Sequence, residues 1–134
     1  VRLLLDDNNT RGMDDLLSIL NDHPNIEIRL FNPFTNRKVR FLGYLIDFKR
    51  LNHRMHNKSL IVDGQAAITG GRNIGDEYFA AGDGMVFSDL DVITIGKIVP
   101  ELSRDFDNYW NSVLSYPAEQ IIVANEFELQ NWVE

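Results

Sequence analysis

A strand, a helix and a second strand follow one another within the first thirty residues, and this order constrains the fold more than any other feature. Val1 to Asp6 is an apolar run typical of a buried strand. Residues 12–21 follow a cluster of turn formers and place leucines on one helical face, and residues 26–30 alternate apolar and polar side chains. A strand, helix and strand in this order connect parallel strands, so we expect an α/β fold.

The remaining sequence predicts a few further elements. They are an amphipathic helix at 37–52, a β-hairpin with strands at 55–62 and 65–69, a strand at 90–95 and a helix at 98–114. The hairpin is predicted because Asp63-Gly64 supplies the positive φ angles of a tight turn. Pro100 is compatible with the last helix only because it falls in its first turn.

Composition excludes several classes of protein. The chain has 134 residues, no cysteine and a net charge of -7, which suits one hydrophobic core and excludes a disulfide framework. No apolar run approaches the roughly 20 residues that a membrane-spanning helix needs. The acidic balance disfavours binding to nucleic acid through bulk charge. Because the chain lacks an initial Met and opens in a strand, we expect a segment of a longer protein.

Basic residues are nevertheless concentrated in one part of this acidic chain. Between positions 37 and 58 the only acidic residue is Asp47. The same stretch contains Arg37, Lys38, Arg40, Lys49, Arg50, Arg54 and Lys58. Such a cluster is either a solvated helix face or the surroundings of an anion.

His56 and Lys58 at the end of this cluster indicate phosphate chemistry. Residues two apart on a strand share a face, so the imidazole and the ammonium should project side by side. A neutral imidazole can attack phosphorus, and an ammonium can hold the non-bridging oxygens. Asp63 has the opposite parity and lies at the predicted turn, so a supporting role suits it better than acid-base catalysis.

A glycine-rich turn follows the hairpin and adds possible phosphate ligands. Gly70 and Gly71 allow backbone amides to approach an anion closely, and Asn73 adds a neutral donor. Neither a Walker loop nor a dinucleotide fingerprint matches this turn.

These residues together resemble the HKD signature of the phospholipase D superfamily. The pattern His-x-Lys-x4-Asp-x6-Gly-Gly-x-Asn spans positions 56–73. Within the superfamily, the opening strand, residues 25–33 and residues 54–58 are most similar to bacterial cardiolipin synthases of the C type. The resemblance covers nearly the whole chain.

The resemblance implies an α/β/α sandwich on a mixed β-sheet, as a single domain at 1–116 that is expected to lack its N-terminal strands. Residues 117–134 would be an extension or the start of a missing second repeat. The resemblance also implies phosphatidyl transfer through a phosphohistidine on His56. No metal or other cofactor is expected to take part. Lys58 and Asp63 would complete the catalytic residues, and Lys58, Gly70, Gly71 and Asn73 would hold the phosphate. The expected location is the bacterial cytoplasm or the inner membrane surface, with peripheral membrane contact.

The family's reaction needs two histidines, whereas this chain has one HKD motif. His23 and His53 lie in no second motif, so the other half must come from the parent chain or a second copy. Arg54 and Arg72 flank the motif segments and are candidates for a second phosphate of a lipid headgroup. Two alternatives stay open: a homodimeric one-repeat nuclease, and a phosphate-binding fragment without turnover.

Overall fold

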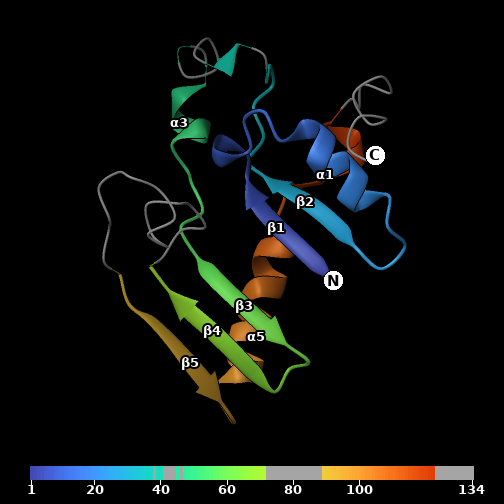
Figure 1. Ribbon diagram of the computed structural model, residues 1–134. Helices are drawn as coiled ribbons and strands as arrows, with labels where there is room; N and C mark the ends of the chain where they lie inside the picture. Colours follow the sequence, from blue (N-terminus) through green and yellow to red (C-terminus); the bar gives the residue numbers. More distant parts are fainter. Residues whose placement is uncertain (38, 41–44, 46, 72–88, 123–134) are drawn as a thin grey trace, which may run out of the picture. The chain divides into compact units, whose positions relative to one another are not determined.

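The computed structural model describes residues 1–37, 39–40, 45, 47–71 and 89–122. They belong to two compact units. Unit 1 contains the described residues of Val1–Met55 and Tyr109–Glu134, and unit 2 is formed by those of His56–Asn108. Each unit has its own three-stranded sheet, and most of the strands are labelled in Figure 1.

The sheet of unit 1 confirms the predicted strand, helix and strand. Strand β1 (Arg2–Asp6) leads through the 3-10 helix η1 (Asp7–Asn9) into helix α1 (Asp14–Asn21), and strand β2 (Glu27–Phe31) follows. β1 and β2 are parallel, with Leu3 opposite Ile28. The acidic residues Asp14 and Asp15 in the first turn of α1 favour its N-terminus.

A hydrophobic core forms between this sheet and its helices. The buried cluster contains Leu17, Ile28, Leu30, Ala118 and Ile122, and other apolar side chains pack around it. Leu17 lies on α1 and Ile28 and Leu30 on β2, so the predicted apolar faces are the buried ones. Burial of this kind contributes most of the stability of a small α/β unit.

A short third strand completes the sheet of unit 1. Strand β6 (Ser115–Pro117) pairs antiparallel with β2 and leads into the 3-10 helix η2 (Ala118–Gln120). β6 was not predicted from the sequence, because three residues are too few to show a period of two.

The predicted helix at 37–52 lies partly outside the described residues. Among those described, helix α3 (Phe48–Leu51) forms the C-terminal turn of the segment. Asp47 before it has non-helical angles, with φ -137° and ψ 43°, so an uninterrupted helix through position 52 is wrong.

Unit 2 contains the predicted hairpin and a third strand. Strand β3 (Lys58–Val62) and strand β4 (Ala66–Gly70) are antiparallel, and β4 also pairs with strand β5 (Asp91–Ile95). Asp63 and Gly64 both have positive φ angles, of 50° and 64°, as predicted for the turn. The amide of Gln65 donates to the Val62 carbonyl at 2.9 Å and closes it.

Helix α5 (Val99–Trp110) follows β5 and confirms the helix predicted near the end of the chain. Val99 is fully buried, whereas Val113, which the helical pattern had included, is 88% exposed because α5 ends at Trp110. The expected α/β class with a mixed sheet is confirmed. In the part of the chain that the structure describes, no helix combines the length and the apolar character needed to cross a bilayer.

Candidate functional site

The motif residues His56 and Lys58 lie at the start of the sheet of unit 2. His56 is exposed and Lys58 is half-buried. The ammonium of Lys58 donates to the backbone carbonyl of His56 at 3.0 Å. An ammonium has three donors, and this bond uses one of them while it keeps the cation beside the His56 backbone.

The predicted strand begins later than expected. β3 starts at Lys58 and not at Met55, so His56 lies in the extended segment that precedes the strand. The reason is the strand pairing: Lys58 is opposite Gly70, the last residue of β4. β4 therefore contains no residue that could pair with His56.

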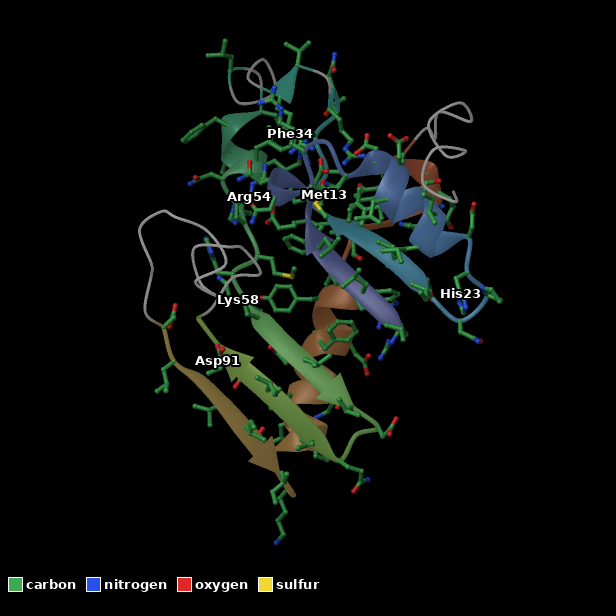
Figure 2. All side chains as sticks on the ribbon, viewed as in Figure 1. Met13, His23, Phe34, Arg54, Lys58 and Asp91 are labelled. Carbon is green, nitrogen blue, oxygen red and sulfur yellow. The ribbon has the colours of Figure 1, made fainter. Side chains whose placement is uncertain are left out.

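Lys58, Gly70 and Asp91 form one row across the sheet. Lys58 pairs with Gly70 and Gly70 with Asp91, and Figure 2 shows Lys58 and Asp91 at the same end of the sheet. A Cβ atom at Gly70 would lie 2.0 Å from Oδ1 of Asp91. Backbone atoms of the neighbouring strand segment are also too close, with the Leu90 carbonyl oxygen at 2.6 Å and Cα of Asp91 at 2.8 Å, so position 70 requires glycine.

Gly71 continues the same arrangement. A Cβ atom at Gly71 would lie 2.4 Å from both carboxylate oxygens of Asp89. The two glycines were expected to expose amides to an anion, and the structure adds a different reason for them. Each glycine makes room for an acidic side chain next to the motif.

Asp63 lies at the other end of β3, in the hairpin turn. Its φ angle of 50° is unusual for a residue other than glycine, and aspartate is among the side chains that tolerate it. This position agrees with the supporting role that its parity suggested. Its catalytic role remains a prediction.

The sheet face that carries Lys58 is apolar beyond the lysine and open to solvent. Side chains two apart on each strand share this face. Its members Leu60, Val62, Ile68, Ile93 and Ile95 are each at least 40% exposed. On the opposite face Ala67 is buried. Unit 2 therefore presents a charged end and an apolar surface on one face.

Unit 1 has a charged cluster of a different kind around Asp7. Asp7 is fully buried, and its carboxylate accepts hydrogen bonds from the Thr10 hydroxyl at 2.7 Å and the Phe34 amide at 2.9 Å. Nε of Arg37 lies 3.0 Å and Nη2 of Arg40 3.6 Å from the carboxylate. Burial lowers the pKa of Arg40, and the negative charge of Asp7 opposes this shift.

Asp6 binds the segment that precedes His56 in the sequence. Its carboxylate accepts hydrogen bonds from Nη1 of Arg54 at 3.1 Å and from the Met55 amide at 2.9 Å. Arg54 also lies over the ring of Phe34, 4.7 Å from its centroid (Figure 2). These contacts hold Arg54 within unit 1, and its expected role as a headgroup ligand remains a prediction.

Asn32 follows the last residue of β2 and binds the segment that precedes the motif. It is fully buried with a φ angle of 50°. Its amide donates to the carbonyls of Arg50 and His53, at 2.8 and 2.7 Å. Asn32 therefore fixes the chain shortly before the motif.

The interpretation of the basic cluster as a solvated helix face is wrong for three of its seven residues. The side chains of Arg37, Arg40 and Arg54 are only 11%, 14% and 12% exposed and pair with acidic residues of the N-terminal part. The expected ligands Arg72 and Asn73 lie outside the described residues. Asp6 and Asp7 were not predicted as partners of these arginines, although consecutive acidic residues at the end of a predicted parallel strand are a usable signal.

Comparison with known proteins gives relatives that match between 64% and 100% of this chain. No protein-family model matches the chain. Cardiolipin synthase C of Escherichia coli K12 is 54% identical over 134 residues, which are 100% of this chain and 28% of that protein. An uncharacterised protein of Helicobacter pylori J99 is 43% identical over 87% of this chain and 24% of its own length.

Cardiolipin synthase of Listeria monocytogenes serotype 4a is 36% identical over 64% of this chain and 17% of that protein. The chain thus spans less than a third of the length of each of these curated relatives. All three are bacterial, in agreement with the expected origin. The chain is therefore related to bacterial cardiolipin synthases, as its resemblance to the C type predicted.

Proposed function

We propose that this chain supplies one of two half-sites of a phosphatidyltransferase that acts on phospholipid phosphodiesters. The observation that carries this function is the position of Lys58, whose ammonium is held at the backbone of the exposed His56. The relationship to cardiolipin synthases supports a lipid phosphodiester as substrate.

His56 acts as the nucleophile in this mechanism. A neutral imidazole nitrogen attacks phosphorus, a P–N bond forms, and the P–O bond to the leaving alcohol breaks. A second histidine, from another motif, donates its proton to the leaving oxygen. Lys58 stabilises the charge on the non-bridging oxygens. The second histidine then deprotonates an acceptor hydroxyl, whose oxygen attacks phosphorus and releases His56.

A second motif must come from outside this chain. The chain has three histidines, and neither His23 nor His53 is followed by the lysine of an HKD pattern. The exposed apolar face that carries Lys58 supports the proposal of a second motif from outside this chain. A large apolar surface next to a polar site commonly contacts another protein surface or a lipid. The source is the remaining length of the parent protein or a second copy.

The proposed location follows from the substrate. A phospholipid donor lies in a bilayer, so the full protein works at a membrane surface, as a bacterial cytoplasmic or peripheral inner-membrane protein. Asn73 and the glycines at 70 and 71 are proposed to help bind phosphate, with Arg54 or Arg72 at a second phosphate of the headgroup. We propose that neither a metal nor another cofactor takes part.

The test uses the full-length protein that contains this chain and vesicles of phosphatidylglycerol, a phosphodiester that also carries hydroxyl groups. Transfer is measured as formation of diphosphatidyl product by mass spectrometry. His56→Ala should lower the rate by at least about a thousandfold, because the nucleophile is lost. His53→Ala is the matched control, and its rate should stay within about threefold. Equal rates for wild type and His56→Ala would contradict the proposal.

A nuclease assay separates the competing enzyme class. A one-repeat nuclease predicts DNA cleavage in the presence of a chelator, with no lipid product. The phosphatidyltransferase predicts the opposite pattern. DNA cleavage that is lost in His56→Ala, together with no transfer in vesicles, would replace lipid transfer by nuclease action.

A further inference from the structure

Asn57 lies between His56 and Lys58 and has no role in the function proposed above. Like His56, it precedes the first residue of β3. The strand pairing begins only at Lys58, opposite Gly70. Among the described residues, no backbone-to-backbone hydrogen bond holds His56 or Asn57. Contacts made by side chains therefore decide how firmly the proposed nucleophile is held.

Asp105 of helix α5 binds the side chain of Asn57. Nδ2 of Asn57 donates to Oδ2 of Asp105 at 3.3 Å. Both residues belong to unit 2, and both are exposed. None of the ion pairs among the described residues involves Asp105. Its carboxylate is therefore available to hold the segment that contains the motif.

The bond to α5 involves the one residue of this segment that faces away from the motif side chains. Residues one apart in an extended chain project to opposite sides, and residues two apart project to the same side. Asn57 therefore projects opposite to His56 and Lys58. A bond that holds Asn57 at α5 directs the imidazole of His56 away from this helix, where it is exposed to solvent.

The residue before His56 is held separately, within unit 1. The amide of Met55 donates to the buried carboxylate of Asp6 at 2.9 Å. Asp6 thus fixes the chain before the nucleophile, and Asp105 fixes it after the nucleophile, each within its own unit. Holding both neighbours restricts the movement of His56. This matters for a nucleophile, because a misplacement of about 1 Å can lower a rate about a hundredfold.

We propose that Asp105 is a positioning residue for His56 and acts through Asn57. It touches neither the substrate nor the reacting atoms in the mechanism described above. Water replaces an exposed hydrogen bond that is lost, so removal of this bond changes stability little and lowers the rate of the chemical step. The inference rests on the proposed function, because it needs His56 as the nucleophile.

Steady-state kinetics of the full-length protein with phosphatidylglycerol vesicles test the inference. Asp105→Ala should lower kcat about tenfold and change KM less than about twofold, because Lys58 still binds the phosphate. Asp105→Asn keeps an oxygen that accepts from Asn57 and should stay within about twofold of wild type. Glu101→Ala removes an exposed carboxylate one turn earlier on α5 and is the matched control, also within about twofold.

A double-mutant cycle tests whether Asp105 acts through Asn57. Asn57→Ala alone should lower kcat about tenfold, and the double variant with Asp105→Ala should also lose about tenfold. Both side chains are exposed, so the variants should fold normally, which circular dichroism checks. Losses that multiply to about a hundredfold, an Asp105→Ala variant as fast as wild type, or equal losses in Asp105→Ala and Asp105→Asn would overturn the inference.

Hydrogen exchange followed by mass spectrometry gives a readout that needs no substrate. The peptide that contains His56 and Asn57 should exchange about fivefold faster in Asp105→Ala and at the wild-type rate in Glu101→Ala. Loss of transfer in His56→Ala, with neither kcat nor exchange changed in Asp105→Ala, overturns the inference and leaves the proposed function standing. If the protein cleaves another phosphodiester and transfers no lipid, the proposed function fails, and the same kcat comparison on that substrate decides the inference. A wild type that turns over no phosphodiester would overturn both.

Discussion

A cluster of charged side chains around Asp7 is buried and paired in unit 1, whereas the motif residues His56 and Lys58 of unit 2 are more accessible. Asp7 has no exposed surface, and its partners Arg37 and Arg40 are nearly as buried. His56 is exposed, and the hydrogen bond from Lys58 goes to its backbone carbonyl and not to its imidazole. This difference indicates that the cluster around Asp7 stabilises the loops of unit 1, whereas the motif residues of unit 2 are available to bind a ligand. Substitutions in the first should lower stability, and those in the second should lower activity.

Asp7→Asn should have the largest effect on stability. It removes the charge that compensates Arg37 and Arg40, and breaking a buried ion pair from one side costs about 3–5 kcal/mol. Urea denaturation measures the free energy of unfolding. Asp14→Asn is the control, because Asp14 is 42% exposed, and it should cost less than about 1 kcal/mol. Similar losses in the two variants would remove the contrast between buried and exposed charge.

Gly70→Ala should have the next largest effect and tests the row across the sheet of unit 2. The new Cβ atom would lie 2.6 Å from the carbonyl oxygen of Leu90 and 2.8 Å from Cα of Asp91. Because these are backbone atoms, β4 and β5 must move apart, at a cost of about 1–3 kcal/mol. At Gly71 the nearest atoms belong to the exposed side chain of Asp89, so Gly71→Ala should cost under about 1 kcal/mol. A larger cost at Gly71 would contradict the described packing.

His56→Ala should have the smallest effect on stability. The side chain is exposed, so the free energy of unfolding should change by less than about 0.5 kcal/mol. The same urea denaturation measures it. A loss comparable to that of Asp7→Asn would show that His56 is a structural residue, and the distinction between the two clusters would fail.

Local sequence signals predicted the elements with clear periodicity or turn chemistry. The Asp63-Gly64 turn, the parallel pair β1 and β2, and α5 are examples. The motif residues His56 and Lys58 were recognised from the types and spacing of the residues at 56–73, and their catalytic roles remain predictions. Each of these features depends on residues that are close in the sequence.

Features that depend on distant residues were not predictable in this way. Arg54 is 48 residues from its partner Asp6, so its charge alone suggested a solvated or ligand-binding side chain. The start of β3 depends on where β4 ends, and the need for Gly70 depends on Asp91 of a third strand. Local patterns contain no information about such partners, which are brought together only by the folded chain.

Mass spectrometry of the full-length protein, quenched during turnover with a phosphodiester substrate, tests the central claim most directly. We expect a phosphatidyl adduct on the peptide that contains His56, and none on that peptide in the His56→Ala variant. An adduct on another residue, with His56 unmodified, would contradict the assignment of His56 as the nucleophile.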